Sequence, residues 1–327
     1  MKHVSILVPE GVVLGSVEGP RQVLTEVNRY CQSQGKPALF DVQLVGMADT
    51  VLAAGGRYTV RTDALIHTVS RTDLIIVPAL DGDLCQTVAA NQSFLPWIVT
   101  HYQQGAEVGS LCVGAFLLAS TGLLNGRQCA THWMAAREFR QLFPQVQLVE
   151  DRIITDEGGL YSSGGAFSYL NLILYLIEKY AGRPTAVFMS KAFQIEIERN
   201  SQSPFIIFQG QKEHGDEAIR QVQQYIETSV DERTTVDELA TRFAMGRRNL
   251  ERRFKRATAN SVVEYIQRVK IEAAKMRFES TRDNVNEVMY SVGYSDPKAF
   301  RLIFRKITGL SPTDYRQKYN RDGLIAS

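Results

Sequence analysis

The last third of the chain contains a degenerate repeat, and this repeat constrains the fold more than any other feature. The segment VDELATRFAMGRRNLERRF at 236–254 resembles VNEVMYSVGYSDPKAFRLIF at 285–304. Phe254 and Phe304, 50 residues apart, close the two copies. In each copy, apolar residues recur at helical spacing on both sides of a short turn. This pattern predicts two helix-turn-helix units.

The second helix of each predicted unit carries charged, mainly basic side chains on its outward face. Pairs of apolar anchors four residues apart, such as Leu250 with Phe254, orient these helices, and Asp296 before a proline marks an N-cap. Long basic side chains can reach base edges or phosphates in a major groove. An ordinary solvated helix gives this pattern once, but two matched copies favour DNA recognition. The outward residues are Arg248, Glu251, Arg252 and Lys255 in the first unit, and Lys298, Arg301 and Arg305 in the second.

A long helix is predicted between the two units, over 261–280. Its continuous apolar stripe consists of Val262, Ile266, Val269, Ala273 and Met276. A helix of this length spans about 30 Å, close to the ~34 Å between successive major grooves on one face of DNA. From Arg242 onward the chain has 19 basic and 9 acidic side chains, which favours a polyanionic partner. The repeat is therefore predicted to read two adjacent grooves.

The first two thirds of the chain show a different pattern, in which short apolar runs alternate with helical stretches. The runs VSILVP (4–9), DVQLVG (41–46), LIIVPAL (74–80) and EVGSLCVG (107–114) fit buried parallel strands. The segment RIITDEGGLYSSGG (152–165) is typical of a hairpin that leads into a helix. This alternation predicts an α/β sandwich with a mostly parallel sheet, followed by an all-α C-terminal domain.

Composition excludes several classes of protein. A hydrophobic content of 44% excludes a disordered chain. The 4 cysteines form no CxxC pair and the 5 histidines are scattered, which predicts neither a disulfide framework nor a metal site. No apolar run reaches the ~18–20 residues of a membrane span, and the N-terminus lacks the pattern of a signal peptide. We therefore expect a cytoplasmic protein without membrane association, metal or cofactor.

The segment EVGSLCVGAFLLASTGLL at 107–124 predicts a strand, a sharp turn and a helix. Ser110 and Gly114, each two residues from Cys112, are small, as a nucleophile elbow requires. Amides at the start of the following helix can lower the pKa of a thiol or bind an anion. His132 is a candidate neighbour of this cysteine. The alternative is a buried structural thiol with a structural histidine, and sequence distance does not choose between them.

The C-terminal motifs resemble the AraC/XylS family of DNA-binding domains. These motifs are LATRFAMGRRNLERRFK, EAAKM in the central helix and VGYSDPKAFRLIFRKITGLSPTDYRQKY, and the resemblance covers about 217–319. One departure is Met289, where the family usually has a small alanine at a helix crossing. The resemblance implies base-contacting positions at Arg248, Glu251, Arg252, Pro297, Lys298 and Arg301, and Arg247 joins the candidate set.

The N-terminal motifs resemble the PfpI-like, class I amidotransferase-like superfamily. Over about 1–209, GSLCVGAFLLASTGLL, ATHW, SSGGAFSYLNLILYLIE and RNSQSPF are similar to the sensor half of GlxA-type transcriptional regulators. The resemblance implies a flavodoxin-like sandwich with a pocket for a small nitrogenous metabolite. Enzymes of the superfamily place a carboxylate where this chain has Ser16, and some have histidine where it has Val113. The pocket candidates are Ser16, Cys112, Val113 and His132, and no catalytic residue is predicted.

These observations predict a sequence-specific transcription regulator. Its segments are a sensor and dimerisation domain (1–209), a linker (210–216), a double helix-turn-helix domain (217–319) and a tail (320–327). The expected partners are double-stranded operator DNA, a second copy of the chain, a small-molecule effector and RNA polymerase. Two alternatives stay open: a cysteine-dependent hydrolase, lyase or amidotransferase-like enzyme with an attached DNA-binding module, and a dimeric regulator without a ligand. The operator, the effector and the direction of regulation also stay open.

Overall fold

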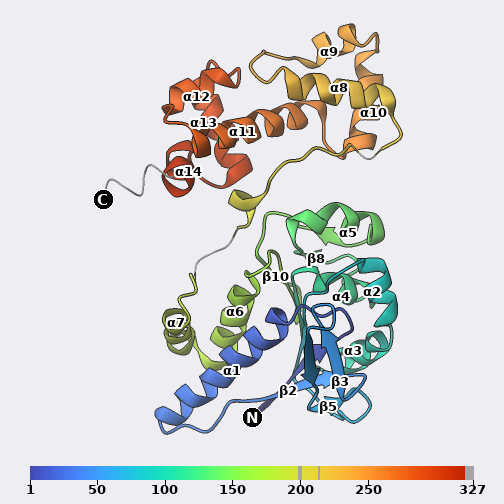
Figure 1. Cartoon of the computed structure of the whole chain (residues 1–327), viewed down its shortest axis with the longest axis vertical. Coiled ribbons are helices and arrows are strands. Elements are labelled where there is room, and N and C mark those ends of the chain that lie inside the picture. Colours follow the sequence, from blue (N-terminus) through green and yellow to red (C-terminus); the bar gives the residue numbers. More distant parts are fainter. Residues whose placement is uncertain (198–200, 213, 321–327) are drawn as a thin grey trace. The chain divides into compact units, whose positions relative to one another are not determined.

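The chain folds into two compact units, Met1–Gln202 and Ser203–Ser327 (Figure 1). The computed structural model describes residues 1–197, 201–212 and 214–320, so the predicted tail lies outside the described residues except for Asn320. The boundary between the units precedes the predicted linker at 210–216. Each unit has its own apolar core, and each is described by itself.

The first unit contains a seven-stranded sheet with the strand order β10-β11-β7-β6-β1-β2-β5. All neighbouring strands are parallel except β10 and β11, which form an antiparallel hairpin. The mostly parallel sheet and the hairpin predicted from the sequence are therefore confirmed. The strands are β1 Lys2–Val8, β2 Phe40–Gly46, β5 Ala64–Leu65, β6 Leu74–Val77, β7 Glu107–Leu111, β10 Ile154–Asp156 and β11 Leu160–Ser163.

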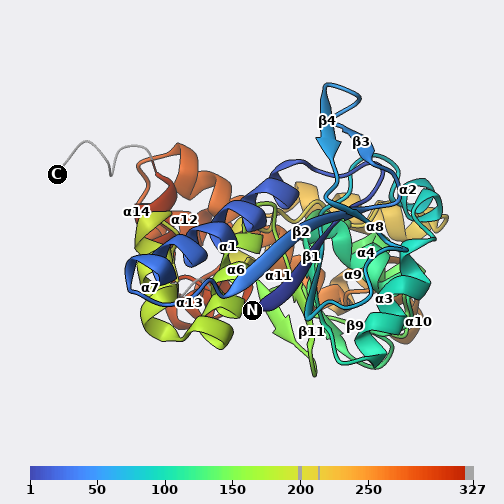
Figure 2. The same cartoon turned by 90° about the horizontal axis from the view of Figure 1, so that it is seen from below.

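Two pairs of short strands lie outside this sheet. Antiparallel β3 (Thr50–Ala53) and β4 (Tyr58–Arg61) form a hairpin that projects from the body of the first unit (Figure 2). Parallel β8 (Gln128–Cys129) and β9 (Gln147–Leu148) lie near β10 and β11. The second pair brings the chain that follows β8 close to the end of the main sheet.

Helices cover both faces of the seven-stranded sheet (Figure 1). Apolar residues of α1, α6 and α7 pack on one face, and those of α2 to α5 pack on the other. Because both faces are buried, the central strands are apolar throughout, and the four residues LIIV of β6 are fully buried. The helices are α1 Gly15–Ser33, α2 Leu84–Ala90, α3 Phe94–Gln103, α4 Ala115–Ser120, α5 Ala136–Leu142, α6 Tyr169–Ala181 and α7 Arg183–Ala192.

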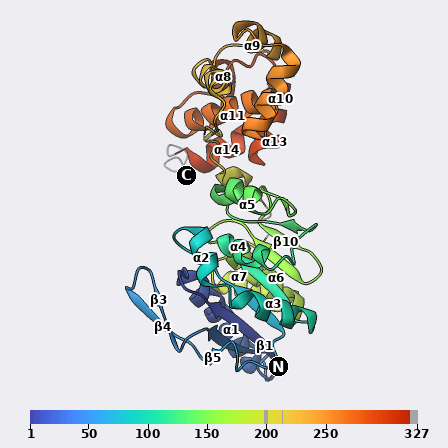
Figure 3. The same cartoon turned by 90° about the vertical axis from the view of Figure 1, so that its right-hand side faces the viewer.

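All secondary-structure elements among the described residues of the second unit are helices, which confirms the predicted all-α domain. In Figure 1, α8 to α10 lie towards one end of the long helix α11, and α12 to α14 lie towards its other end. Figure 3 shows the same helical unit turned by 90°. Two apolar clusters, one at each end of α11, form the core of this unit. The helices are α8 Glu217–Thr228, α9 Val236–Arg242, α10 Arg247–Thr258, α11 Val262–Ser280, α12 Val285–Ser291, α13 Pro297–Thr308 and α14 Pro312–Tyr319.

The apolar stripe predicted along α11 is wrong in its second half. The stripe residues up to Val269 are buried in the first cluster, but Met276 is 62% exposed. Ile271, Ala274 and Phe278 form the buried face of the second half. The physical reason is that this 19-residue helix packs against two different groups of helices, and each group contacts a different side of it. A single stripe at regular spacing describes a helix with only one buried face.

The residues just before the predicted linker pack onto α11 and do not form a loose connection. The Lys275 Nζ donates to the carbonyl oxygen of Ile206 (2.7 Å) and to the carboxylate of Glu272 (2.8 Å). The Phe208 amide donates to the same carboxylate (3.1 Å). The side chain of Lys275 is almost fully buried, so its ion pair with Glu272 is shielded from solvent. This segment therefore belongs structurally to the second unit.

Candidate functional site

Helices α9 and α10 form the first helix-turn-helix unit. Thr235 caps α9 in a capping box with Glu238, in which each side chain accepts the backbone N–H of the other residue (3.2 and 2.7 Å). The turn passes through Ala244, whose φ of +49° lies in the left-handed region. Leu250 and Phe254 are fully buried beneath α10. Consequently, the opposite side of α10 faces solvent.

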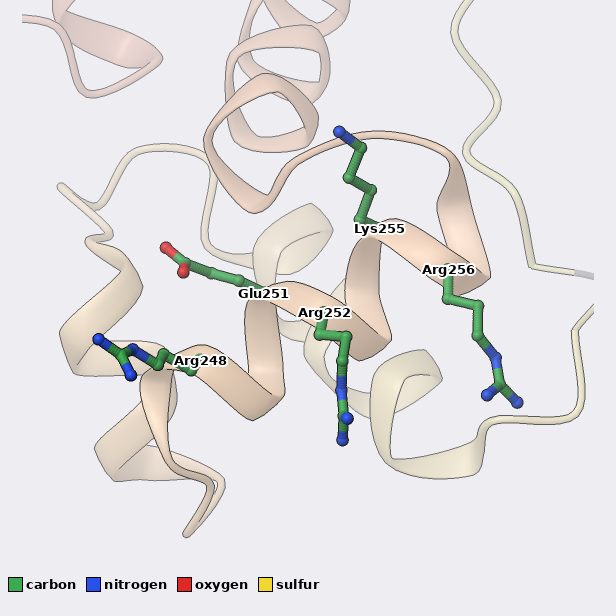
Figure 4. Close-up of a pocket in the computed structure, with 5 residues that line it drawn as sticks. All are labelled: Arg248, Glu251, Arg252, Lys255 and Arg256. Atoms are coloured by element: carbon green, nitrogen blue, oxygen red, sulfur yellow. The ribbon is translucent and has the colours of Figure 1, made fainter.

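The exposed side of α10 carries a stripe of charged side chains around a shallow hollow (Figure 4). Arg248, Arg252 and Lys255 are exposed, as predicted, whereas Glu251 is half-buried. Arg256, four residues after Arg252, also lines the hollow and was not among the predicted residues. The i, i+4 spacing from Arg252 is the sequence signal that identifies it. The lining residues are Arg248, Glu251, Arg252, Lys255 and Arg256.

Arg247 is held by carboxylates of its own unit. Its guanidinium lies 2.9 Å from the carboxylate of Asp237 in α9 and 3.4 Å from that of Glu251. These two carboxylates raise the pKa of Arg247 above its ordinary value. Arg252 donates to the side chain of Asn249 (3.1 Å), whereas the described structure contains no ion pair of Arg248. Arg247 therefore connects α9 to α10, and Arg248 carries an uncompensated charge towards solvent.

Helices α12 and α13 repeat the arrangement of the first unit. Asp296 accepts the backbone N–H of Lys298 (2.8 Å), which confirms the predicted N-cap of α13. Gly293 in the turn has a φ of +70°, matching the left-handed residue in the turn of the first unit. Phe300 and Phe304 are fully buried and anchor α13 as the corresponding apolar residues anchor α10.

The outward side of α13 includes one apolar residue that the sequence analysis did not single out. Leu302 is 70% exposed, and its counterpart 50 residues earlier is Arg252. Met289, the noted departure from the AraC/XylS pattern, is buried in the second apolar cluster, so this unit accommodates its larger side chain. The predicted residues Pro297, Lys298, Arg301 and Arg305 are all exposed.

A buried lysine of α11 connects the two helix-turn-helix units. The side chain of Lys270 donates to the carbonyl oxygens of Val230 (2.7 Å), Glu232 (2.7 Å) and Val292 (2.9 Å). Val230 and Glu232 precede α9, and Val292 lies in the turn between α12 and α13. Burial lowers the pKa of Lys270, but the three carbonyl oxygens match the three donors of an ammonium group. Lys270 therefore fixes the position of one unit relative to the other within this domain.

In the N-terminal unit, Met1–Gln202, Cys112 occupies a strand-to-helix elbow directly after β7. Its φ of +54° is left-handed, as in a strained turn. Gly114 lies so close to the end of the neighbouring strand β6 that an added Cβ would be 2.3 Å from the carbonyl oxygen of Pro78. Burial raises the pKa of Cys112 to about 11, although a hydrogen bond from the Val113 amide acts in the opposite direction. The elbow geometry exists, but at neutral pH the sulfur is a thiol and not a thiolate.

Ser16 and Val113 lie close to this elbow in the fold. The buried Ser16 hydroxyl donates to the carbonyl oxygen of Val13 (2.7 Å) and accepts the backbone N–H of Ala79 (2.9 Å). Ala79 adjoins the residue against which the elbow glycine packs. Val113 is half-buried. The hydroxyl of Ser16 therefore fixes the start of α1 against the end of β6, and it supplies no acidic group to the elbow.

His132 has a local structural role. Its Nδ1 accepts the backbone N–H of Met134 (3.2 Å), so the ring caps the short 3-10 turn Trp133–Ala135. Burial lowers the pKa of His132, which keeps the ring neutral at pH 7. Within the described residues, no hydrogen bond joins this ring to the sulfur of Cys112. Thr131, the residue before His132, contacts the backbone of Cys112, but His132 itself makes no hydrogen bond with the thiol among the described residues.

Other residues, which the sequence analysis did not select, surround the backbone of the elbow. The Thr131 hydroxyl donates to the carbonyl oxygen of Cys112 (3.0 Å). The amide nitrogen of Gln202 donates to the carbonyl oxygen of Thr131 (3.1 Å) and to that of Arg152 (3.2 Å). Because both partners are carbonyl oxygens, the orientation of the Gln202 amide is determined. The motif RNSQSPF, which contains Gln202, was the available sequence signal.

Two buried polar atoms beside the elbow have no hydrogen-bond partner within the described residues. They are the Gln202 Oε1 and the Ser163 Oγ. Ser163 pairs in register with Leu111, the residue before Cys112. Gly164 packs against the Gln202 amide so closely that an added Cβ would lie 2.3 Å from its nitrogen. Buried polar groups are normally paired, so these two atoms are exceptions among the described residues.

The described residues contain no cluster of three or more histidines, cysteines or acidic residues that could hold a metal ion. Among the described helices, none has the length and apolar character that a membrane crossing requires.

Comparison with protein families identifies both parts of the chain. A model of the DJ-1/PfpI family matches residues 2–179, more than half of the sequence. This chain belongs to the DJ-1/PfpI family. A helix-turn-helix domain model matches residues 239–318, which include α10 and α13. Both resemblances stated from the sequence motifs are thereby confirmed.

Characterised relatives of this DJ-1/PfpI chain include regulators and an enzyme. The HTH-type transcriptional regulator GbdR of Pseudomonas aeruginosa is 27% identical over 249 residues, covering 73% of this chain and 67% of that protein. The HTH-type transcriptional regulator GlxA of Rhizobium meliloti is 23% identical over 218 residues (65% and 66%). Isonitrile hydratase of Pseudomonas putida is 29% identical over 135 residues, which covers 41% of this chain and 54% of the enzyme.

Proposed function

We propose that this DNA-binding transcription regulator reads its operator by placing α10 and α13 in adjacent major grooves. The observation that carries the proposal is the pair of outward stripes, which recur 50 residues apart on helices held by the same α11. The 19 residues of α11 extend over about 28 Å. This length is close to the ~34 Å separation of successive grooves on one face of DNA.

The proposed contacts follow from the chemistry of each exposed side chain. Arginine and lysine pair with guanine edges or with phosphates, so Arg248, Arg252, Lys298 and Arg301 are assigned to base edges. Lys255 and Arg305, one turn further along each helix, are assigned to phosphates. Glu251 can accept from a cytosine amino group, while Arg247 positions Glu251. Pro297 contributes shape at the start of α13, because its side chain has no polar atom.

Selection of binding sites from random DNA tests this proposal with the full-length protein. We expect the enriched sequences to contain two specific blocks whose centres lie about one helical turn, roughly 10 base pairs, apart. Footprinting of the selected site should protect both blocks on the same face of the DNA. If no sequence is enriched in the selected pool, or if the enriched site contains a single block, the two-groove arrangement is contradicted.

The remaining partners are inferred from general principles. We infer a symmetric homodimer, because two-fold pairing is the commonest closed assembly and because it doubles the DNA contacts of each complex. RNA polymerase is the partner that a regulator of transcription would contact. DNA binding likewise supports the predicted cytoplasmic location, where the operator would be accessible. The oligomeric state in solution is the first of these properties to measure.

We further propose that the elbow of Cys112 belongs to a binding site for an effector and not to an enzyme. A nucleophilic cysteine needs a base and an orienting group, whereas this thiol is buried and protonated and has no contact with His132. The hydroxyl of Ser16 is fully engaged by the backbone. The similarity to isonitrile hydratase keeps a cysteine-dependent enzyme as the competing candidate.

The unpaired polar atoms beside the elbow support a ligand of defined chemistry. The Gln202 Oε1 needs a hydrogen-bond donor, and the Ser163 hydroxyl can donate or accept. The effector is therefore expected to present an N–H or O–H donor to the Gln202 Oε1. Gln202 is also the last residue of the first unit, Met1–Gln202.

Alkylation of the cysteines by iodoacetamide at different pH values distinguishes the binding site from an enzyme. Because its pKa is raised from 9.0 to about 11, Cys112 should hold about 100-fold less thiolate at neutral pH than an unperturbed thiol. It should therefore react much more slowly than the exposed Cys85, which is the internal control, and accelerate as the pH approaches 11. An effector should shield Cys112 in this assay, and Gln202→Leu should remove that shielding. Faster alkylation of Cys112 than of Cys85 at pH 7 would favour the enzyme.

A further inference from the structure

Helix α13 exposes one large apolar side chain in the middle of its basic stripe. Leu302 is 70% exposed and follows Arg301 directly. It lies four residues after Lys298 and three residues before Arg305, so it shares a helix face with both. An exposed leucine is ordinary by itself, but this one occupies the centre of the surface that is proposed to enter a major groove.

The first helix-turn-helix unit has a different kind of residue at the equivalent position. The residue of α10 that corresponds to Leu302 is Arg252, which lines the hollow on the outward side of α10 (Figure 4). Every other lining residue of that hollow has a charged counterpart 50 residues later. These counterparts are Lys298 for Arg248, Arg301 for Glu251, Arg305 for Lys255 and Lys306 for Arg256. Among the residues that line the hollow, Arg252 is the one whose counterpart is apolar, whereas Glu251 is exchanged for a cation and the other three keep their positive charge.

We propose that Leu302 determines specificity by packing against the C5-methyl group of a thymine. The inference rests on the proposed function, in which α13 lies in a major groove. Leucine has no donor or acceptor, so it can pair with neither a phosphate nor the polar edge of a base. The thymine methyl is the one apolar group that an unmodified base pair presents in the major groove. The cations Lys298 and Arg305 on the same face hold the helix against the DNA backbone.

This assignment makes the two halves of the operator chemically different. Arg252 favours a guanine, whose O6 and N7 accept hydrogen bonds from a guanidinium. Leu302 favours a thymine at the corresponding position of the half-site read by α13. A single chain would therefore bind an asymmetric site although its two reading helices have the same fold. Substitution Leu302→Arg should move the preference at that position from thymine to guanine.

Replacement of thymine by uracil in the selected operator tests the contact with the full-length protein. Deoxyuridine keeps the base pairing and lacks only the methyl group. Loss of one apolar contact of this size should weaken binding about fourfold at one thymine of the α13 half-site. In Leu302→Ala the same replacement should have no effect. Met276→Ala, at an exposed apolar residue of α11, is the matched control and should keep the full sensitivity of the wild type.

The outcomes separate this inference from the proposed function. A protein that selects no specific DNA overturns the proposed function, and this inference with it. A protein that binds its operator but tolerates uracil at every thymine overturns only the role of Leu302. Uracil sensitivity that persists in Leu302→Ala assigns the methyl contact to another residue. If Leu302→Ala and the wild type bind uracil and thymine operators equally but differ in transcription, Leu302 contacts a protein and the inference is wrong.

Discussion

Arg248→Ala and Arg252→Ala are each expected to weaken operator binding by about 1–3 kcal/mol, while binding to random DNA falls much less. Both guanidinium groups project from the exposed side of α10 (Figure 4). Substitution of Arg248 removes no ion pair of the described structure. Substitution of Arg252 removes one hydrogen bond, to Asn249. The change in affinity should therefore report contacts with DNA and not a loss of folding.

Dissociation constants for the operator and for random DNA at one salt concentration measure this difference. Arg220→Ala is the matched control. Arg220 is an exposed arginine of α8 that pairs with Glu217 (2.6 Å), and it lies outside both reading helices, α10 and α13. Equal losses on operator and random DNA would show that Arg248 and Arg252 contact only phosphates. A control variant as weak as the two others would instead indicate a general effect of positive charge.

Lys270→Met should destabilise the C-terminal unit, Ser203–Ser327, and also disturb the alignment of its two reading helices, α10 and α13. The substitution leaves three backbone carbonyl oxygens without the ammonium donor, which should lower the free energy of unfolding by about 3 kcal/mol. These carbonyls belong to the segment before α9 and to the turn before α13. Loss of the three hydrogen bonds therefore removes a direct connection between the two helix-turn-helix units. Operator affinity should fall, and the footprint should shrink towards one half of the site.

Chemical denaturation and footprinting of the full-length protein test this prediction. Lys318→Met, at an exposed lysine of α14, should leave both measurements close to those of the wild type. Gly293→Ala is a second variant, since an added Cβ there would lie 2.5 Å from the Lys270 Nζ and should disturb the same hydrogen bonds. Unchanged stability and an unchanged footprint in both variants would show that Lys270 does not align the two units.

The sequence alone determined the features that depend on local patterns. The helix-turn-helix units follow from apolar residues at helical spacing and from caps, and Asp296 indeed caps α13. The mostly parallel sheet follows from apolar runs separated by helices. Exposure of the charged stripe on α10 follows because Leu250 and Phe254 fix which side is buried. Each of these properties depends on residues a few positions apart, so the periodicity of the side chains is sufficient evidence.

Only the tertiary structure decided the properties that depend on distant residues. The pKa of Cys112 is raised because the whole sandwich buries it, although the elbow pattern itself suggested a reactive thiol. The contacts of Gln202 and Lys270 join segments 71 and 40 residues apart, which no local spacing can reveal. Met276 is exposed because α11 packs on two sides in turn. Burial and hydrogen bonding at these positions are set by how the elements pack together, and this information is absent from any short stretch of sequence.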